Sequence, residues 1–367
     1  MRKKQLLILI IMILFLAGCW DEHQLVNKTF VNGVSFDLSE DGKIQATVRA
    51  LNITGKGGGQ FEVEDELINA ERPSTVGLAF DIDSMVAGEA DFSQAHILLI
   101  GDEMAQNGIN ELLEPFYRGR QSNITQKVAI TKGKAETIIS TEKEKSPIAF
   151  FILQAIEGAE HSTYLPTENL STIWTKIQTP GKDMILPYLE NAEERIKIAG
   201  VALFHGDKFS GETFSREQSS LLLLMLDQLK ITNRMALILE KGQEDLSISF
   251  STLKMKRDME VLVNKKHMII CNVDIDLQIE VSSYPQHFKE DLNLKKLEKD
   301  LSEELTKQAK EIVTTLLKAN CDAFGVGLKV SSKHPDLWKQ MDWDEEYKNV
   351  QIEPKVKVKI LKTGNLY

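Results

Sequence analysis

The stretch MIICNVDIDLQIEVS, Met268–Ser282, alternates apolar and polar residues over its whole length. Its apolar positions are Ile269, Cys271, Val273, Ile275, Leu277, Ile279 and Val281. A repeat of two residues places alternate side chains on opposite sides of a β-strand. The stretch therefore predicts a long strand of an antiparallel sheet, with one face buried in a core and the other in water.

A different repeat follows this strand. Apolar residues recur every three or four positions between charges: Leu294, Leu297, Leu301, Leu305, Ala309, Ile312 and Leu316. This spacing predicts an amphipathic helix that packs on the apolar face of the sheet. We expect the helix to end near Asn320, because asparagine tolerates the left-handed backbone of a helix end. Residues 350–361 alternate again, and Pro354 favours an edge strand there.

The rest of the chain carries signals for both kinds of element. Strand patterns occupy residues 29–37, 43–52, 95–100, 127–131 and 196–215, the last as two paired strands with a bend at Gly206-Asp207. Helical patterns occupy residues 73–87, 101–108, 109–118, 146–156, 167–177 and a stretch after Ser215, which with Gln218 forms a capping box. The first of these has a stripe of Val76, Ala79, Phe80 and Asp83, and Thr167 is the expected cap of the helix that ends at 177. We predict an α+β ectodomain of several lobes, with antiparallel and mixed sheets packed by helices and a domain boundary between residues 197 and 198.

The N-terminus has the composition of an export signal. Basic residues at positions 2–4 precede twelve apolar residues, Leu6–Ala17. As a helix this run spans about 18 Å, whereas the hydrocarbon core of a bilayer is about 30 Å thick. A basic head, a short apolar run and small residues at its end are typical of a secretory signal peptide.

The end of this segment resembles the lipobox of bacterial lipoproteins: Leu16, Ala17, Gly18 and Cys19. In that motif the cysteine thiol takes a diacylglyceryl group, and the peptidase cuts just before it. We therefore expect residues 1–18 to be a lipoprotein signal peptide and Cys19 to anchor the mature chain, because two acyl chains give stable attachment. The alternatives are a secretory signal with a coincidental cysteine and a signal retained as an anchor.

Composition and motifs exclude several classes of protein. The formal net charge is −10, which disfavours binding to nucleic-acid phosphates. The chain has no HExxH, GxSxG, CxxC or GxxxxGK[ST] motif, so we predict no enzyme, no metal site and no cofactor. The GKGGG run at residues 55–59 follows no apolar strand at phosphate-loop spacing and is interpreted as a mobile linker.

Four features admit a functional and a structural interpretation. Asp274 and Asp276 share a strand face, with Glu280 further along, and these carboxylates could bind a cation, although a simple polar face is the favoured interpretation. His96 is interpreted as a buried histidine with its hydrogen bonds satisfied. An exported compartment permits a disulfide between Cys271 and Cys321, but two buried free thiols are favoured. The aromatic stretch 337–347 fits packing against the last domain or a protein-contact patch.

Several segments together resemble one family, the Ger(x)C family of C-subunit lipoproteins of spore germinant receptors. The segments are Cys19-Trp20-Asp21, the block His96–Gln121, the block Ile198–Leu224, Asn320–Gly327 with His334–Trp338, and the terminal Val-Lys-Val-Lys strand. They occur in the family's order from residue 19 to about 361. One departure is Gly119 after Arg118, where the family commonly has an aspartate.

The resemblance implies a non-catalytic, lipid-anchored subunit of a nutrient germinant receptor. It implies a place on the outer face of a bacterial membrane, the spore inner membrane, and contacts with two polytopic subunits. It transfers a role to Cys19 alone, since the 322–327 turn is interpreted as architecture. The alternative is a substrate-binding lipoprotein of a transporter, but such proteins usually consist of two lobes of alternating βα units.

Overall fold

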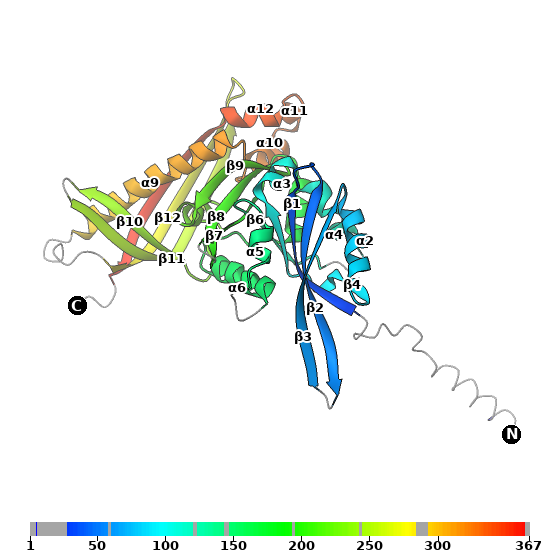
Figure 1. Ribbon diagram of the computed structural model, residues 1–367. Helices are drawn as coiled ribbons and strands as arrows, with labels where there is room; N and C mark the ends of the chain where they lie inside the picture. The colour runs from blue at the N-terminus through cyan, green and yellow to red at the C-terminus, as the bar shows by residue number, and fades with distance from the viewer. Residues whose placement is uncertain are drawn as a thin grey trace.

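The computed structural model of the protein describes Gln5 and residues 28–57, 60–119, 123–142, 147–192, 195–241, 244–283 and 293–363. Within these residues two β-sheets form, and helices pack on both. This arrangement confirms the predicted α+β class. Figure 1 shows an elongated molecule, with β10–β13 (residues 234–362) on the left and β1–β3 (residues 28–72) on the right.

The first sheet is mixed, with strand order β3-β2-β1-β5-β6-β7-β8-β9 and with β4 paired to β1. Its strands are β1 Lys28–Leu38, β2 Ile44–Gly57, β3 Gln60–Arg72, β4 Glu89–Asp91, β5 Ile97–Gly101, β6 Lys127–Thr131, β7 Ile185–Ala192, β8 Arg195–His205 and β9 Lys208–Ser215. Strands β1, β5, β6 and β7 run parallel, and antiparallel strands extend the sheet on both sides. The predicted hairpins at 29–52 and 196–215 are confirmed.

Helices cover both faces of this sheet: α2 Thr75–Met85, α3 Asp102–Asn107, α4 Asn110–Arg118, α5 Glu136–Ile139, α6 Ile148–His161, α7 Leu170–Ile177 and α8 Arg216–Met225. In β5, Ile97 and Leu99 face the core that contains α5, α6 and α8. Leu98 and Ile100 face the core that contains α2, α3, α4 and α7. Burial on both faces explains why this strand is a continuous apolar run in the sequence.

The second sheet has the order β10-β11-β12-β13. Its strands are β10 Arg234–Lys241, β11 Glu244–Val263, β12 Ile269–Ser283 and β13 Gln351–Lys362. Strand β12 is the predicted alternating strand, and its apolar face is buried. It pairs antiparallel with β11 but parallel with β13, so the expected antiparallel sheet is mixed.

The predicted long helix is α9 Leu294–Lys318, and its buried stripe runs from Leu297 to Leu316. Leu294, which the pattern placed in that stripe, is 42% exposed. The helix ends as expected, with Asn320 in the left-handed region at a φ of 53°. After α9 come the short helices α10 Val326–Lys333, α11 Pro335–Trp338 and α12 Trp343–Glu346.

Helix α9 also lies along the free edge of β13. Backbone N–H groups of this strand donate to α9 side chains four residues apart. The acceptors are Glu298 Oε1, Ser302 Oγ and Thr306 Oγ1, at 2.8, 2.9 and 3.0 Å. The predicted edge position of β13 is thus confirmed, and the helix satisfies an edge that would otherwise be open to pairing with another strand.

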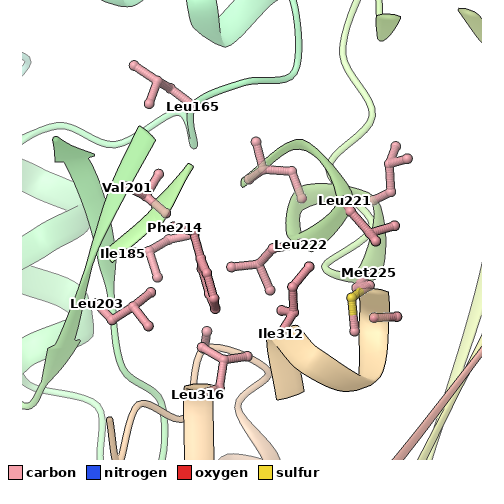
Figure 2. Packing of buried hydrophobic residues seen from close by; sticks show 14 of the residues in the cluster. Leu165, Ile185, Val201, Leu203, Phe214, Leu221, Leu222, Met225, Ile312 and Leu316 are labelled. Carbon is pink, nitrogen blue, oxygen red and sulfur yellow. The ribbon is translucent and has the colours of Figure 1, made fainter. Parts of the chain in front are cut away.

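One core joins the two sheets (Figure 2). Leu203 of β8 and Phe214 of β9 lie on the left of the view, Leu222 of α8 lies beside Phe214, and Ile312 and Leu316 of α9 lie below them. The predicted boundary at 197/198 falls within β8, which pairs with β7 on both sides of it. The division into domains therefore stays a prediction.

Several local expectations are wrong. The apolar stripe assigned to α2 is the exposed one: Val76 and Phe80 are 52% and 73% exposed, whereas Leu78 and Ile82 are buried. Asn169, not a residue at 167, caps α7. The linker assigned to 55–59 is contradicted at 55–57, which belong to β2; residues 58–59 lie outside the described residues.

Candidate functional site at the junction of the two sheets

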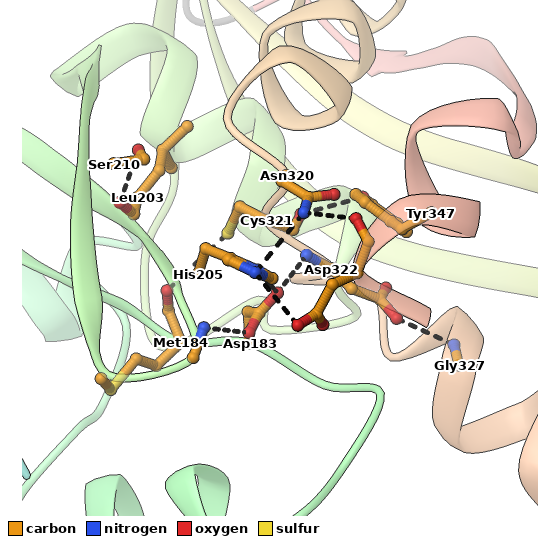
Figure 3. Close-up of polar contacts among 12 residues, drawn as sticks. Asp183, Met184, Leu203, His205, Ser210, Asn320, Cys321, Asp322, Gly327 and Tyr347 are labelled. Atoms are coloured by element: carbon orange, nitrogen blue, oxygen red, sulfur yellow. Dashed lines mark hydrogen bonds and ion pairs between the residues drawn. The ribbon is translucent and has the colours of Figure 1, made fainter. Parts of the chain in front are cut away.

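Two loops far apart in the sequence bind each other where the sheets meet (Figure 3). Residues 181–184 lead into β7, and residues 319–325 connect α9 to α10. The N–H of Asp322 donates to Asp183 Oδ2 at 2.8 Å, and the N–H of Asp183 donates to the Asp322 carbonyl at 3.0 Å. The N–H of Leu328 donates to the Gly181 carbonyl at 2.9 Å. These bonds connect the first sheet to the helices of the second.

Asp322 is the central polar group of this junction, and it is 1% exposed. Its Oδ1 accepts the N–H of Val326 at 2.9 Å, and its Oδ2 accepts the N–H of Gly327 at 2.8 Å. These are the first N–H groups of α10, which have no partner within the helix. The residue before α10, Gly325, has a φ of 67° and no side chain that could cap them. Burial raises the pKa of Asp322 to about 7.

A second cluster of charges surrounds Asp183. Its Oδ1 accepts the N–H of Gly206 at 2.7 Å. The imidazole Nδ1 of His205 lies 3.7 Å from Asp183 Oδ2, and its Nε2 lies 3.7 Å from Asp344 Oδ2. Asp183 is the largest cause that raises the pKa of His205. A protonated imidazole is therefore stabilised between two carboxylates, Asp183 before β7 and Asp344 in α12.

The aromatic stretch 337–347 covers the junction. The ring of Trp343 lies 5.4 Å from that of Trp338 and 5.8 Å from that of Tyr347, between centroids. The buried Tyr347 hydroxyl donates to the Cys321 carbonyl at 2.8 Å. This geometry supports packing, rather than a free protein-contact patch, as the role of these aromatic residues.

Gly327 is packed too tightly to carry a side chain. A Cβ there would lie 2.5 Å from Trp343 Cε2 and 2.7 Å from Gly181 Cα. We expect Gly327→Ala to lower the free energy of unfolding by about 1–3 kcal/mol, as overpacking does in other cores. Urea unfolding followed by circular dichroism measures this change.

The matched control is Gly158→Ala. Gly158 lies in α6, and a Cβ there would meet nothing within 4 Å. We expect this variant to be slightly more stable than the wild type, because alanine favours helix. Equal effects of the two substitutions would contradict the close packing at Gly327.

The site offers contacts rather than reactive groups. Cys271 and Cys321 are buried free thiols, and no bridge joins them. Burial raises the pKa of Cys271 to about 12 and that of Cys321 well above its usual range, so neither thiol is a ready nucleophile. Within the residues that the structure describes, no group of three or more His, Cys, Asp or Glu side chains could hold a metal ion.

The other singled-out residues lie away from this junction. On the solvent face of the second sheet, Asp274 is opposite Lys355 and Asp276 is opposite Lys357. On the other side, β11 places Lys256 opposite Asp276 but Asp258 opposite Asp274. The lysines opposite both acids on β13 support the polar-face interpretation. His96 is partly buried, with its ring edge-on to Phe150.

The lipobox residues Leu16, Ala17, Gly18 and Cys19, and the following Trp20 and Asp21, lie outside the described residues. Their roles stay predictions. Among the described helices, none is long and apolar enough to cross a membrane.

Sequence reasoning missed the pairing of Asp183 with residue 322 and the position of His205. The pattern around residues 205–207 indicated a bend between strands, which is confirmed, but nothing in it indicated an ion pair. The 320–327 segment was recognised as a motif and interpreted as architecture, which agrees with its hydrogen bonds.

Comparisons with known proteins show which family of proteins the chain resembles. Residues 21–191 match the N-terminal domain of spore germination proteins, and residues 199–364 match the spore germination B3/GerAC-like C-terminal domain. The spore germination protein GerQC of Bacillus cereus is 22% identical over 98% of this chain and 99% of its own. The putative spore germination protein YfkR of Bacillus subtilis is 22% identical over 96% and 95%.

The crystal structure of the GerBC protein has the same fold. It aligns with a TM-score of 0.58 and 16% identity over 93% of this chain and 100% of its own. The chain belongs to the Ger(x)C family, the C-subunits of spore germinant receptors. This membership gives it a role in spore germination.

Proposed function

We propose that this protein is a lipid-anchored, non-catalytic subunit of a nutrient germinant receptor in the spore inner membrane. It acts through contacts with two polytopic subunits. The observation that carries the proposal is the order of its parts: two germination domains at 21–191 and 199–364 directly follow the lipobox cysteine. An acyl anchor at this cysteine would keep the subunit beside its membrane partners.

The shared core and the polar junction support a role in transmission by contact. The first sheet, α8, α9 and the second sheet form one buried cluster. The junction adds hydrogen bonds between residues 139 positions apart. A partner that binds either sheet would therefore act on a unit whose two halves are packed together.

Deletion of the gene tests the proposal. We expect the spores to lose germination toward particular nutrients and to keep it toward others and toward non-nutrient triggers, because only one receptor is disabled. Loss of absorbance of a spore suspension measures this response. The control is the deletion strain that carries the wild-type gene at another locus. Normal responses to every nutrient, in a strain without related receptor genes, would refute the proposal.

A further inference from the structure

A cavity of about 240 Å³ lies beside the junction, with walls from both halves of the molecule. From the first half it is lined by Lys176 at the end of α7 and by Lys182 before β7. From the second half it is lined by Arg257 of β11 and Lys329 of α10. Four cationic side chains thus surround a space large enough for a small ligand.

Only one of these cations has a carboxylate partner among the described residues. Lys176 is held by Glu168, outside the cavity lining. Lys182 makes no hydrogen bond or ion pair within the part of the chain that the structure describes. Arg257 Nε donates to the Met225 carbonyl at 3.1 Å, and Arg257 Nη2 donates to Met259 Sδ at 2.7 Å.

The remaining cation, Lys329, also has a neutral partner: its Nζ donates to the Met259 carbonyl at 3.2 Å. The one acid in the lining is Asp183. Its oxygens already accept N–H groups of Gly206 and Asp322. The lining therefore holds three cations that no carboxylate neutralises by direct contact.

These charges are close enough to repel one another. Burial, and then the charge of Lys176, lower the pKa of Lys182, and Arg257 lowers it further. Burial lowers the pKa of Arg257 as well. The acids that oppose this effect are Glu168 and Asp322 near Lys182, and the exposed Asp227 and Asp258 near Arg257. Half-buried like charges without a counter-ion favour the entry of an anion.

We propose that this cavity binds a small oxyanion with two negative charges, a dicarboxylate or a phosphate. Arg257 Nη1, which makes no hydrogen bond among the described residues, can donate to such a group, and Lys182 and Lys329 supply further charge-assisted donors. The volume equals that of about eight water molecules, which suits a ligand of this size. This inference goes beyond the proposed receptor role and does not depend on the lipid anchor.

Thermal unfolding and titration calorimetry of the detergent-purified full chain test the site. Inorganic phosphate and succinate are the probes, each compared with sodium chloride of equal ionic strength and with acetate. We expect 10 mM of at least one probe to raise the melting temperature by about 3 °C or more, because a ligand that binds only the folded state stabilises it. A response to one probe alone identifies which oxyanion the cavity takes.

Variants locate the effect in the cavity. Lys182→Gln removes one of the three cations without breaking a described contact, and we expect it to weaken binding about tenfold or more. Lys182→Glu places a carboxylate inside the cavity, and we expect it to abolish the response while the folded protein keeps its melting temperature. Lys299→Gln, on the exposed face of α9, is the matched control and should bind as the wild type does. No response of the wild type to either probe, or an equal response of Lys182→Gln, would overturn the site.

Discussion

Asp322→Ala is expected to lower the free energy of unfolding by about 2–4 kcal/mol at pH 6. The substitution leaves the N–H groups of Val326 and Gly327 without their acceptor. A buried donor that loses its partner costs about 1–3 kcal/mol, and Asp322 is 1% exposed, so water does not readily replace the carboxylate. Urea unfolding of the wild type and the variant, followed by circular dichroism, measures the difference.

An exposed aspartate serves as the control. Asp336 lies at the start of α11, and its side chain is 93% exposed. We expect Asp336→Ala to change the stability by less than about 0.5 kcal/mol, as surface substitutions usually do. If Asp322→Ala were as mild as this control, the two N–H bonds would not stabilise the junction.

The dependence of folding stability on pH tests the role of Asp322 a second time. Because burial raises the folded pKa of Asp322 to about 7, above its unfolded value of 3.8, the folded state favours the neutral acid. The stability that this preference contributes is full below pH 4 and is lost as the pH rises through 7. His205 acts in the same direction, since its raised pKa means that its contribution is present below 6.5 and lost above the folded value.

Asp322 and His205 should therefore make the wild type less stable as the pH rises from 5 to 8, in addition to any effect of its other titratable groups. Asp322→Asn cannot ionise, so we expect its stability to fall less over the same range. The variant keeps one oxygen for an N–H group but offers an amide where the second oxygen was, so it is also less stable than the wild type at pH 6. A parallel fall in both proteins would assign the pH dependence to other residues.

The sequence predicts best those elements whose apolar residues keep one regular period along the whole strand or helix. Strand β12 keeps strict alternation from Ile269 to Val281, and α9 keeps its stripe from Leu297 to Leu316. Strand β11 was missed because its pairing with β12 shifts register between Ser249 and Phe250 and again between Thr252 and Lys254. The second shift leaves Leu253 of β11 without a partner, so the buried positions change from Ile248 and Phe250 to Met259 and Val261, and no single period of two runs through the strand.

For helix α2 the sequence predicts the helix but not the side that is buried. It carries apolar residues on two sides, so periodicity alone does not tell which side packs on the sheet. The structure buries the side of Leu78 and Ile82 and leaves Val76 and Phe80 exposed. The choice depends on neighbouring elements, which a local pattern does not contain.

The junction could be recognised only in part. Its residues come from loops 139 positions apart, and a short loop such as 181–184 carries no periodic signal. The glycines at 325 and 327 were a usable signal, since a left-handed backbone and a close approach both favour glycine. Their partners, Asp183 and Trp343, follow only from the tertiary structure.

Cys19→Ala is expected to abolish attachment of the lipid and to reduce germination through this receptor to near the level of the deletion. The lipobox interpretation requires the thiol, because the diacylglyceryl group is joined through a thioether. Without acyl chains the protein loses about 0.8 kcal/mol of membrane affinity for every CH₂ that would have been buried. Under the proposed function it also loses the high local concentration beside its polytopic partners that the anchor would give it.

Labelling of cells with radioactive palmitate, followed by isolation of the protein, measures the first effect, and nutrient germination measures the second. The matched control is Cys271→Ala, which removes a thiol that the fold buries at 0% exposure. That variant should incorporate palmitate as the wild type does, since an acyl transferase at the membrane has no access to a core residue. Palmitate in Cys19→Ala would refute the lipobox assignment. If the Cys19→Ala protein takes up no palmitate but the spores germinate fully, protein contacts alone hold the subunit in place. That result would contradict the lipid anchor in the proposed function.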